Sequence, residues 1–173
     1  MSRVRMAIAG LTLSAAAFGG LVLHESYTSE AIIPTKNDRP TVGFGSTFRE
    51  DGSPVELGDT ITPPRAVARS LAHIAKDEMG LKRCVTGKLN QVEYDILVDF
   101  AYQYGVPTAC TSSMVRHINA GHYETACRAY TLYRKTSDGR GGLRDCSLPA
   151  NRRICGGVWT RALKRQADCL AAQ

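Results

Sequence analysis

Six cysteines, all between residues 84 and 169, constrain this chain more than any other feature. No two have the Cys-x-x-Cys spacing of zinc and redox sites. An even number behind an export-like N-terminal segment favours disulfide bonds and an oxidising compartment. Fifteen pairings are open to six cysteines. Cys146 and Cys155 bracket a short proline-containing loop and are placed to close it locally. Elimination and the rough positions of the expected helices favour two further pairs, Cys127–Cys169 and Cys84–Cys110, although the connectivity stays largely open.

The chain of 173 residues is long enough for one hydrophobic core and too short for two comfortable domains. A formal net charge of +6 indicates an anionic partner or surface, unless the basic residues merely form a solvated face. Ten Lys and Arg lie between Arg128 and Cys169, and only three Asp oppose them. No aromatic platform of the kind that single-strand binding prefers interleaves these charges and no nucleic-acid-binding motif is present, so no nucleic acid is expected as a partner.

The N-terminal sequence MSRVR carries two arginines, and an uncharged segment follows from Met6 to Leu23. Its length is just sufficient for a helix that spans a bilayer, and the arginines would keep the N-terminus cytoplasmic. Because Ala, Gly, Ser and Thr occupy most of its positions, residence in lipid would be marginal. Three interpretations compete: a cleaved signal peptide ending near Ala17, a permanent anchor, and a signal-anchor that later releases into the soluble fold. Cleavage after Ala17 would leave few residues for a helix carrying Glu25, so release is favoured if Glu25 is catalytic.

Secondary-structure signals predict a mainly helical chain with one hairpin. The hairpin is expected over residues 31–47, around a KNDR turn, with Gly43 and Gly45 giving one strand a bare face that a ligand can approach. Residues 48–61 are expected to form a loop. Five helices are expected after the loop. The first begins at Pro63, with Val67, Leu71 and Ile74 inward, and the second begins at a capping box formed by Asn90 and Glu93. The others are expected from Ser112 or Ser113 to a stop at Gly121, from near Tyr123, and from Thr160 to Ala171 with Leu163, Ala167 and Leu170 inward. The stretch SDGRGGLRD is expected to be a mobile loop, and Trp159 to lie in the core or, alternatively, in a cleft wall.

Glu25 lies two residues beyond the end of the apolar segment and is the leading catalytic candidate. Hydrolysis of a glycosidic bond requires an acid that protonates the leaving oxygen, and desolvation would raise the pKa of such a carboxyl group. A solvated glutamate at a helix end is the alternative from residue type alone. The surrounding pattern, HESYTSEAIIPTKNDRPTVGFGST, resembles the catalytic motif of the T4-type phage lysozymes of glycoside hydrolase family 24. Later stretches, LNQVEYDILVDFAYQYG, TSSMVRHINAGHY and GGVWTRALKRQADCL, resemble further segments of that family in the correct order.

This resemblance implies an α+β, mainly α fold, with a small β-hairpin lobe, a larger helical lobe and a cleft between them. It implies a muramidase that cleaves the β-1,4 bond between N-acetylmuramic acid and N-acetylglucosamine in peptidoglycan, without cofactor or metal, as a monomer. Residues 1–23 resemble the N-terminal segment of the signal-anchor-release subclass, and residues 24–173 the catalytic domain. The enzyme would then be held at the host inner membrane through residues 6–23, facing the periplasm, until its release there. The basic C-terminal face would favour binding to the anionic cell wall.

The sequence departs from the family pattern at the middle catalytic position, where an Asp or Cys is usual. Thr35 stands there, six residues before Thr41, so the resemblance assigns the catalytic set as Glu25, Thr35 and Thr41, with the two threonines orienting water. Asp38 is the alternative if the hairpin register shifts, although Asp is common in turns. Glu30 is a weaker candidate. Arg161, on the last predicted helix, is either a partner of Glu25 or a surface arginine.

Two other functions remain open from the sequence. One is a secreted wall-binding module that lacks catalysis, for which the missing Asp is the best argument. The other is a lytic transglycosylase, which works with a single glutamate and forms an anhydro-sugar.

Overall fold

The computed structural model describes residues 4–34 and 38–173, and only the backbone of residues 23–25. The chain divides into two compact units, which are described separately. The hairpin unit comprises Leu13–Gly80, and the helical unit comprises Met1–Thr12 together with Leu81–Gln173. The fold is a mainly helical α+β arrangement of the lysozyme-like type with small β-hairpins, as the resemblance implied.

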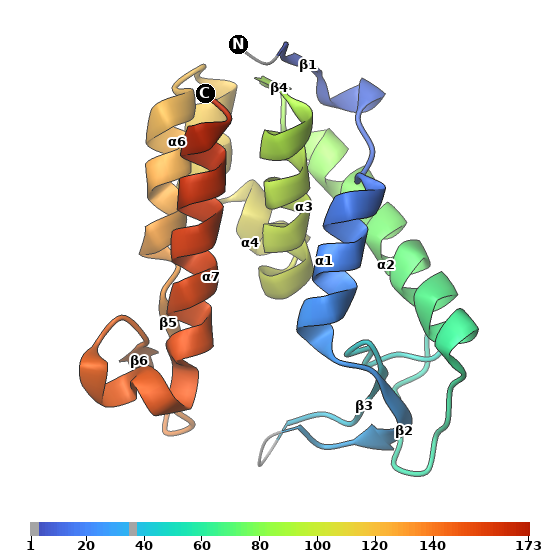
Figure 1. The fold of residues 1–173 in the computed structure, drawn as a ribbon. Coiled ribbons are helices and arrows are strands. Elements are labelled where there is room, and N and C mark those ends of the chain that lie inside the picture. Colours follow the sequence, from blue (N-terminus) through green and yellow to red (C-terminus); the bar gives the residue numbers. More distant parts are fainter. Residues whose placement is uncertain (1–3, 35–37) are drawn as a thin grey trace. The chain divides into compact units, whose positions relative to one another are not determined.

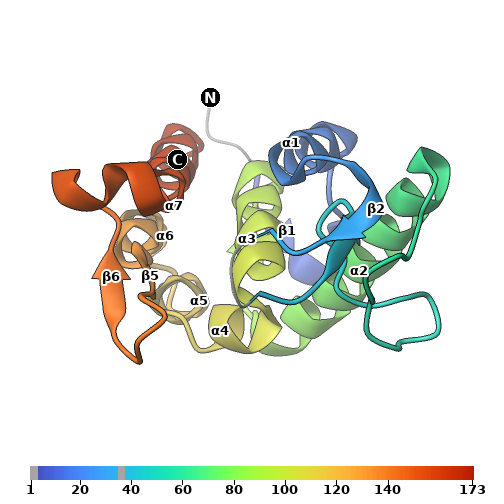
Figure 2. The same cartoon turned by 90° about the horizontal axis from the view of Figure 1, so that it is seen from below.

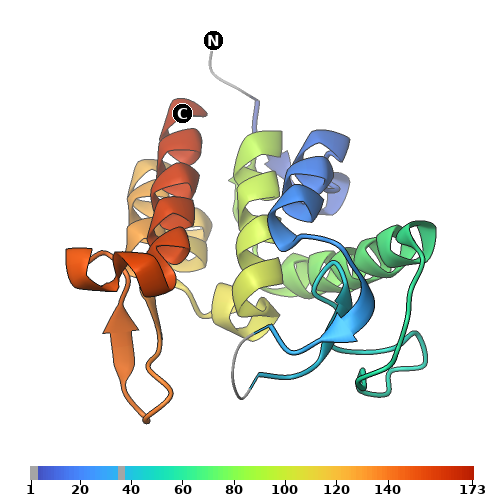
Figure 3. The ribbon, with the colours of Figure 1, turned by 60° about the horizontal axis from the view of Figure 1, so that its bottom comes forward.

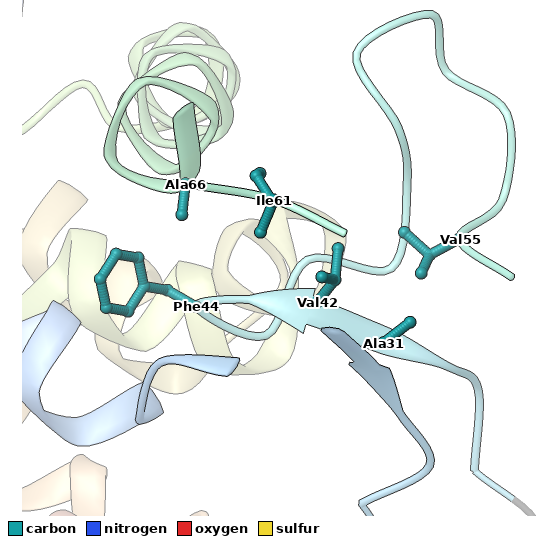
Figure 4. Close-up of a cluster of buried hydrophobic side chains, with 6 residues drawn as sticks. All are labelled: Ala31, Val42, Phe44, Val55, Ile61 and Ala66. Atoms are coloured by element: carbon teal, nitrogen blue, oxygen red, sulfur yellow. The ribbon is translucent and has the colours of Figure 1, made fainter. Parts of the chain in front are cut away.

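The hairpin unit contains α1 (Ala15–Glu25), the antiparallel strands β2 (Thr28–Ile32) and β3 (Thr41–Gly43), and most of α2 (Pro63–Cys84) (Figure 1). The hydroxyl group of Ser14 caps α1 by accepting a hydrogen bond of 3.1 Å from the Ala17 amide. A small core joins the hairpin, the loop after it and the start of α2; its buried members are Ala31, Val42, Phe44, Val55, Ile61 and Ala66 (Figure 4). This core fixes the hairpin against the first turn of α2.

The helical unit begins with an N-terminal arm, residues 4–12, that is built into its surface. Strand β1 (Met6–Ala7) pairs antiparallel with β4 (Lys88–Leu89), and Ile8 and Leu11 are buried. The remaining elements are α3 (Gln91–Tyr104), α4 (Val106–Cys110), α5 (Ser113–Asn119), α6 (Tyr123–Ala129), β5 (Lys135–Ser137), β6 (Leu143–Asp145) and α7 (Arg152–Ala171). Short 3₁₀ helices lie at Ile8–Gly10, Tyr130–Leu132 and Pro149–Asn151. Helix α6 lies between α5 and α7 (Figure 2).

Three disulfide bonds staple the helical unit: Cys84–Cys110, Cys127–Cys169 and Cys146–Cys155. All three are the pairs that the sequence favoured. The capping box is also confirmed, because the Asn90 side chain accepts from the Glu93 amide at 3.0 Å while the Glu93 carboxylate accepts from the Asn90 amide at 2.9 Å.

Among the described residues, no helix combines the length and the apolar character needed to cross a membrane.

The buried faces predicted for two helices, α2 and α7, are wrong in part. Leu71 is 49% exposed, and the buried stripe of α2 runs instead through Ala66, Ser70 and Ile74, at intervals of four residues. Helix α7 begins at Arg152, not Thr160, with a kink at Cys155. Its predicted inward residues Leu163 and Ala167 are exposed, while Ala162, Arg165 and Cys169 are buried.

Long-range contacts explain the rotation of α7. The disulfide to Cys127 turns Cys169 inward, and the guanidinium group of Arg165 donates to Asp99 Oδ2 at 2.6 Å and to Gln103 Oε1 at 2.7 Å. Neither constraint appears in the hydrophobic periodicity of the helix, which is why the predicted face was wrong.

One predicted loop and the predicted environment of Trp159 also differ from expectation. The stretch predicted as a mobile loop contains the β5–β6 hairpin, in which Lys135 pairs with Asp145 and Ser137 with Leu143. Trp159 is half-buried and not a core residue. Residues 48–61 form a loop as predicted, with isolated bridges joining Phe48 to Pro54 and Glu30 to Thr60.

Candidate active site

Glu25 is the last residue of α1, so the predicted helix that carries it is present. The next residue, Ser26, has a φ of 52°, which is unusual for a residue other than glycine. Backbone strain of this kind costs about 1–3 kcal/mol and persists only where neighbouring contacts enforce it. Sequence reasoning singled out nothing at Ser26, because a serine between a helix and a strand carries no signal for positive φ. The turn directs the chain from α1 into β2.

Contacts on both sides of Glu25 anchor this turn to the hairpin core. Val22 packs against the buried cluster from α1, and Tyr27 packs against it from the other side. The Tyr27 hydroxyl group donates to the Ile61 carbonyl at 2.7 Å, and its ring lies 5.5 Å from that of Phe44. The backbone at Glu25 is thus held to the same core that positions β3.

Thr41 is the first residue of β3 and is half-buried. Its neighbour Val42 is 1% exposed and points into the core (Figure 4). Because side chains alternate along a strand, Thr41 faces away from that core. Thr41 pairs with Ile32, and an irregularity follows before the next pair, Thr28 with Gly43. Glu25 and Thr41 therefore belong to one compact unit and are attached to one core.

The glycines of β3 do not form the bare, ligand-facing surface that was predicted. Gly43 is buried, and a Cβ atom there would lie 3.0 Å from the Ala66 Cβ and 3.4 Å from the Ile61 Cγ2. Its φ of 69° also favours glycine. Gly43 thus serves the close approach of β3 to α2, and Gly45 lies exposed in the turn that follows.

The other candidates are dispersed. Thr35 lies outside the described residues, so its assignment remains a prediction. Asp38 is exposed, and its carboxylate accepts from the Arg39 amide at 2.9 Å. Glu30 is exposed on β2. Arg161 is half-buried on α7, in the helical unit, and its pairing with Glu25 remains a prediction.

An arginine network closes the loop that follows the hairpin. Arg49 donates to Asp59 at 2.7 and 2.9 Å and to Glu56 at 3.0 Å. The Arg49 hydrogen bond lowers the pKa of Asp59, and the same contact raises the pKa of Arg49. A pocket of about 280 Å³ lies here, lined by Val42, Arg49, Glu50, Asp51, Asp59, Thr60, Arg65 and Arg69. The three arginines and three carboxylates that line the pocket balance in charge. We therefore interpret the network as stabilising the conformation of the loop, not as a binding site for a charged ligand.

Among the residues whose side chains the structure describes (4–22, 26–34 and 38–173), no group of three or more His, Cys, Asp or Glu is suited to a metal ion.

A family model described as "Phage lysozyme" matches residues 20–153. The chain is 31% identical to the endolysin of Salmonella phage P22 over 114 residues, which cover 66% of this chain and 75% of that protein.

Two solved structures share the fold. An endolysin from Escherichia coli O157:H7 phage FAHEc1 superimposes with a TM-score of 0.80 at 23% identity, over 95% of this chain and 96% of the other. The muramidase domain of SpmX from Asticaccaulis excentricus gives a TM-score of 0.74 at 18% identity, over 92% and 97% of the two chains.

Proposed function

The chain belongs to the phage lysozyme family of peptidoglycan hydrolases, and we propose that Glu25 is the general acid of this glycoside hydrolase. The scissile bond is the β-1,4 linkage between N-acetylmuramic acid and N-acetylglucosamine. Glu25 donates its proton to the glycosidic oxygen as the bond breaks, and a water molecule attacks the sugar carbon and loses a proton to the surrounding solvent. Thr41, together with Thr35, orients that water through hydroxyl hydrogen bonds.

One observation carries this assignment: α1 ends at Glu25, and both that end and the strand bearing Thr41 are packed onto one small core. Catalysis by positioned groups requires such a fixed spacing, because a displacement of about 1 Å can cost about a hundredfold in rate. A hydroxyl group is a poorer base than a carboxylate. Glu25 therefore supplies most of the chemistry, and the threonines contribute orientation.

The test is lysis of chloroform-treated Gram-negative cells by the wild type and by Glu25→Gln. The substitution keeps the size of the side chain but removes its acid, so we expect the lytic rate to fall by about a hundredfold to ten-thousandfold. Glu30→Gln is the matched control, because it neutralises an exposed carboxylate in the same hairpin and should leave lysis unchanged. Equal lysis by wild type and Glu25→Gln would refute the assignment. No lysis by the wild type would favour a non-catalytic wall-binding module.

The middle position is tested separately. Thr35→Ala and Asp38→Ala, compared with Thr41→Val, identify which residue helps to place the water. We expect a loss of activity for Thr35→Ala and Thr41→Val, and little change for Asp38→Ala. Product masses distinguish hydrolysis from transglycosylation, because an anhydro-sugar is lighter than the hydrolysis product by one water.

We further propose that residues 6–23 hold the enzyme inactive at the inner membrane before release into the periplasm. The segment carries no charge, yet parts of it have defined places in the folded protein: Ile8 and Leu11 are buried in the helical unit, and Leu21 is buried on α1. The same residues therefore cannot be in lipid and in the folded enzyme together. While they are inserted, α1 is withheld and Glu25 has no fixed position. The three disulfides fit an oxidising compartment.

Leucine substitutions on the exposed side of α1 test the tether without disturbing the fold. Ala15, Ala16 and Gly19 are exposed, and a Cβ atom at Gly19 would meet nothing within 4 Å. Leucine at all three positions favours the membrane by about 0.3–0.6 kcal/mol per residue relative to a neutral side chain. We expect the triple leucine variant to stay in the membrane fraction and delay lysis. Glutamine at the same positions is the control, and it should release early. Indistinguishable timing in the two variants would exclude the tether while leaving the role of Glu25 intact.

A further inference from the structure

Residues 132–154 of the helical unit, here called the stapled segment, present large apolar side chains to solvent. Leu132, Leu143, Leu148 and Ile154 are 62%, 71%, 52% and 64% exposed. Single exposed leucines are ordinary on protein surfaces, whereas several within one short segment are typical of an interaction site.

The same segment is strongly basic. It contains six Lys and Arg against two Asp, giving four net positive charges in 23 residues of a chain whose total is +6. Both carboxylates are engaged within the segment: Asp145 accepts from Ser147 and Arg134, and Asp138 accepts from the amides of Arg140 and Gly142.

The remaining cations have no such partner. The side chains of Lys135, Arg140, Arg152 and Arg153 are exposed and form no ion pair with any carboxylate that the structure describes. The positive charge of the segment is therefore directed to solvent rather than neutralised within the fold.

The segment is held in one conformation. The register of β5 with β6 places Lys135 and Leu143 on one face of the hairpin, because paired and alternate residues share a face. The Cys146–Cys155 disulfide closes the following loop, which carries Leu148 and ends beside Ile154. In Figures 1 and 3, the hairpin and the first turn of α7 lie side by side at one end of the helical unit. A preformed surface loses little conformational entropy on binding.

We propose that the stapled segment docks on the surface of an anionic phospholipid bilayer. The guanidinium and ammonium groups contact lipid phosphates, and the leucine and isoleucine side chains enter the interface between headgroups and acyl chains. This surface is distinct from residues 6–23, which lie elsewhere in the chain. It would keep a released enzyme near membranes.

Lipid fits these residues better than the cell wall. Peptidoglycan offers sugars and peptides, which cations and hydroxyl groups bind but which give aliphatic side chains no apolar phase to enter. Four exposed Leu and Ile side chains among unpaired cations match a membrane interface, where both features contribute to binding.

The test is co-sedimentation of the full chain with vesicles of phosphatidylcholine alone and with 30% phosphatidylglycerol. We expect binding only to the anionic vesicles, weakening as salt rises. Arg152→Gln/Arg153→Gln should reduce partitioning about twenty-fivefold, since each cation near such a surface contributes about fivefold. Leu143→Ser/Ile154→Ser should reduce it about tenfold.

Matched controls keep the test specific. Arg128→Gln/Lys164→Gln removes two exposed cations from elsewhere in the helical unit, and Leu57→Ser removes a leucine that is 63% exposed, against 64% for Ile154. Both controls should bind as the wild type does. Equal losses in controls and test variants, or binding to phosphatidylcholine alone, would overturn the proposal.

Activity on purified, membrane-free peptidoglycan is the second readout. All variants should digest it at the wild-type rate. A loss there that follows the stapled segment would assign this surface to the cell wall and refute lipid docking.

Discussion

Arg5 contacts Glu93 across 88 positions of sequence: its Nη2 lies 2.6 Å from Glu93 Oε1, and its Nε lies 2.9 Å from Oε2. The Arg5 guanidinium also lies 3.7 Å from the centre of the Tyr123 ring and donates to Gln173 Oε1 at 2.7 Å. Glu93 is 4% exposed and also belongs to the capping box of α3. The hydrogen bond from Arg5 to Glu93 raises the pKa of Arg5. One cation thus joins the N-terminal arm to the start of α3.

Arg5→Lys should lower the free energy of unfolding by about 2–3 kcal/mol, because the ammonium group of lysine cannot reproduce the bidentate contact of the guanidinium group with the buried Glu93 carboxylate. Denaturant unfolding measures the change. Arg128→Lys is the control, since its pair with Glu124 is exposed and should change stability by less than about 0.5 kcal/mol. A double-mutant cycle that combines Arg5→Lys with Glu93→Gln should give a coupling free energy above about 1 kcal/mol. Additive effects of the two substitutions on the free energy of unfolding would contradict a direct contribution of the Arg5–Glu93 contact to stability.

Gly43→Ala should destabilise the protein by about 2–3 kcal/mol, because the new methyl group meets Ala66 at 3.0 Å and the backbone has positive φ. Gly19→Ala provides the opposite case. Its Cβ meets nothing within 4 Å inside α1, so stability should rise by about 0.5–1 kcal/mol. Thermal melts of the two variants should move in opposite directions, and a shared direction would refute the assigned role of Gly43.

The contributions of the three disulfides to the free energy of unfolding should increase with the length of the loop that each one closes. Their sequence separations are 42, 26 and 9 residues, which predict losses of about 4, 3.5 and 2.7 kcal/mol when both cysteines of a pair become serine. Paired substitution avoids an unmatched thiol. Equilibrium unfolding measures the ranking, with Cys127→Ser/Cys169→Ser expected as the least stable variant. A larger loss from opening Cys146–Cys155 would show that its native contacts outweigh chain entropy.

Stability should fall in acid between about pH 4 and pH 2. Hydrogen bonds from Ser147 and Arg134 lower the pKa of Asp145 to about 2, and the pKa values of Asp51, Asp59 and Asp138 are also lowered. A carboxylate with a depressed folded-state pKa stabilises the fold fully above its unfolded value, near 3.9, and that contribution is lost as pH falls toward the folded value.

Thermal melts of Asp145→Asn across this range test the assignment. The variant should be less stable at pH 6 and lose less on acidification than the wild type. Parallel pH profiles for the two proteins would exclude Asp145 from the acid response.

Local signals in the sequence were sufficient for several elements. The capping box of α3 was predictable because Asn90 and Glu93 act on each other within one turn. The end of α1 at Glu25 agrees with the motif that resembles the phage lysozymes. Such features depend on neighbours a few residues away, and their sequence signature is therefore complete.

Features set by distant partners were not predictable. The rotation of α7 depends on Arg165 reaching Asp99, and the strand at Met6 depends on Leu89. Gly43 suggested an open face because the approach of Ala66 is invisible in the sequence. The candidate site shows the same division: the chain positions of Glu25 and Thr41 were readable, whereas the positive φ of Ser26 was not.

The pairing of β1 with β4 has a consequence for biosynthesis. Residues 4–12 leave the ribosome before α3 exists, so the arm has no partner strand and no Glu93 while most of the chain is still being made. During that interval neither β4 nor Glu93 can compete with a translocation channel or a bilayer for residues 4–12. The order of translation therefore means that the arm can take its place in the fold only after β4 and α3 of the helical unit have been synthesised.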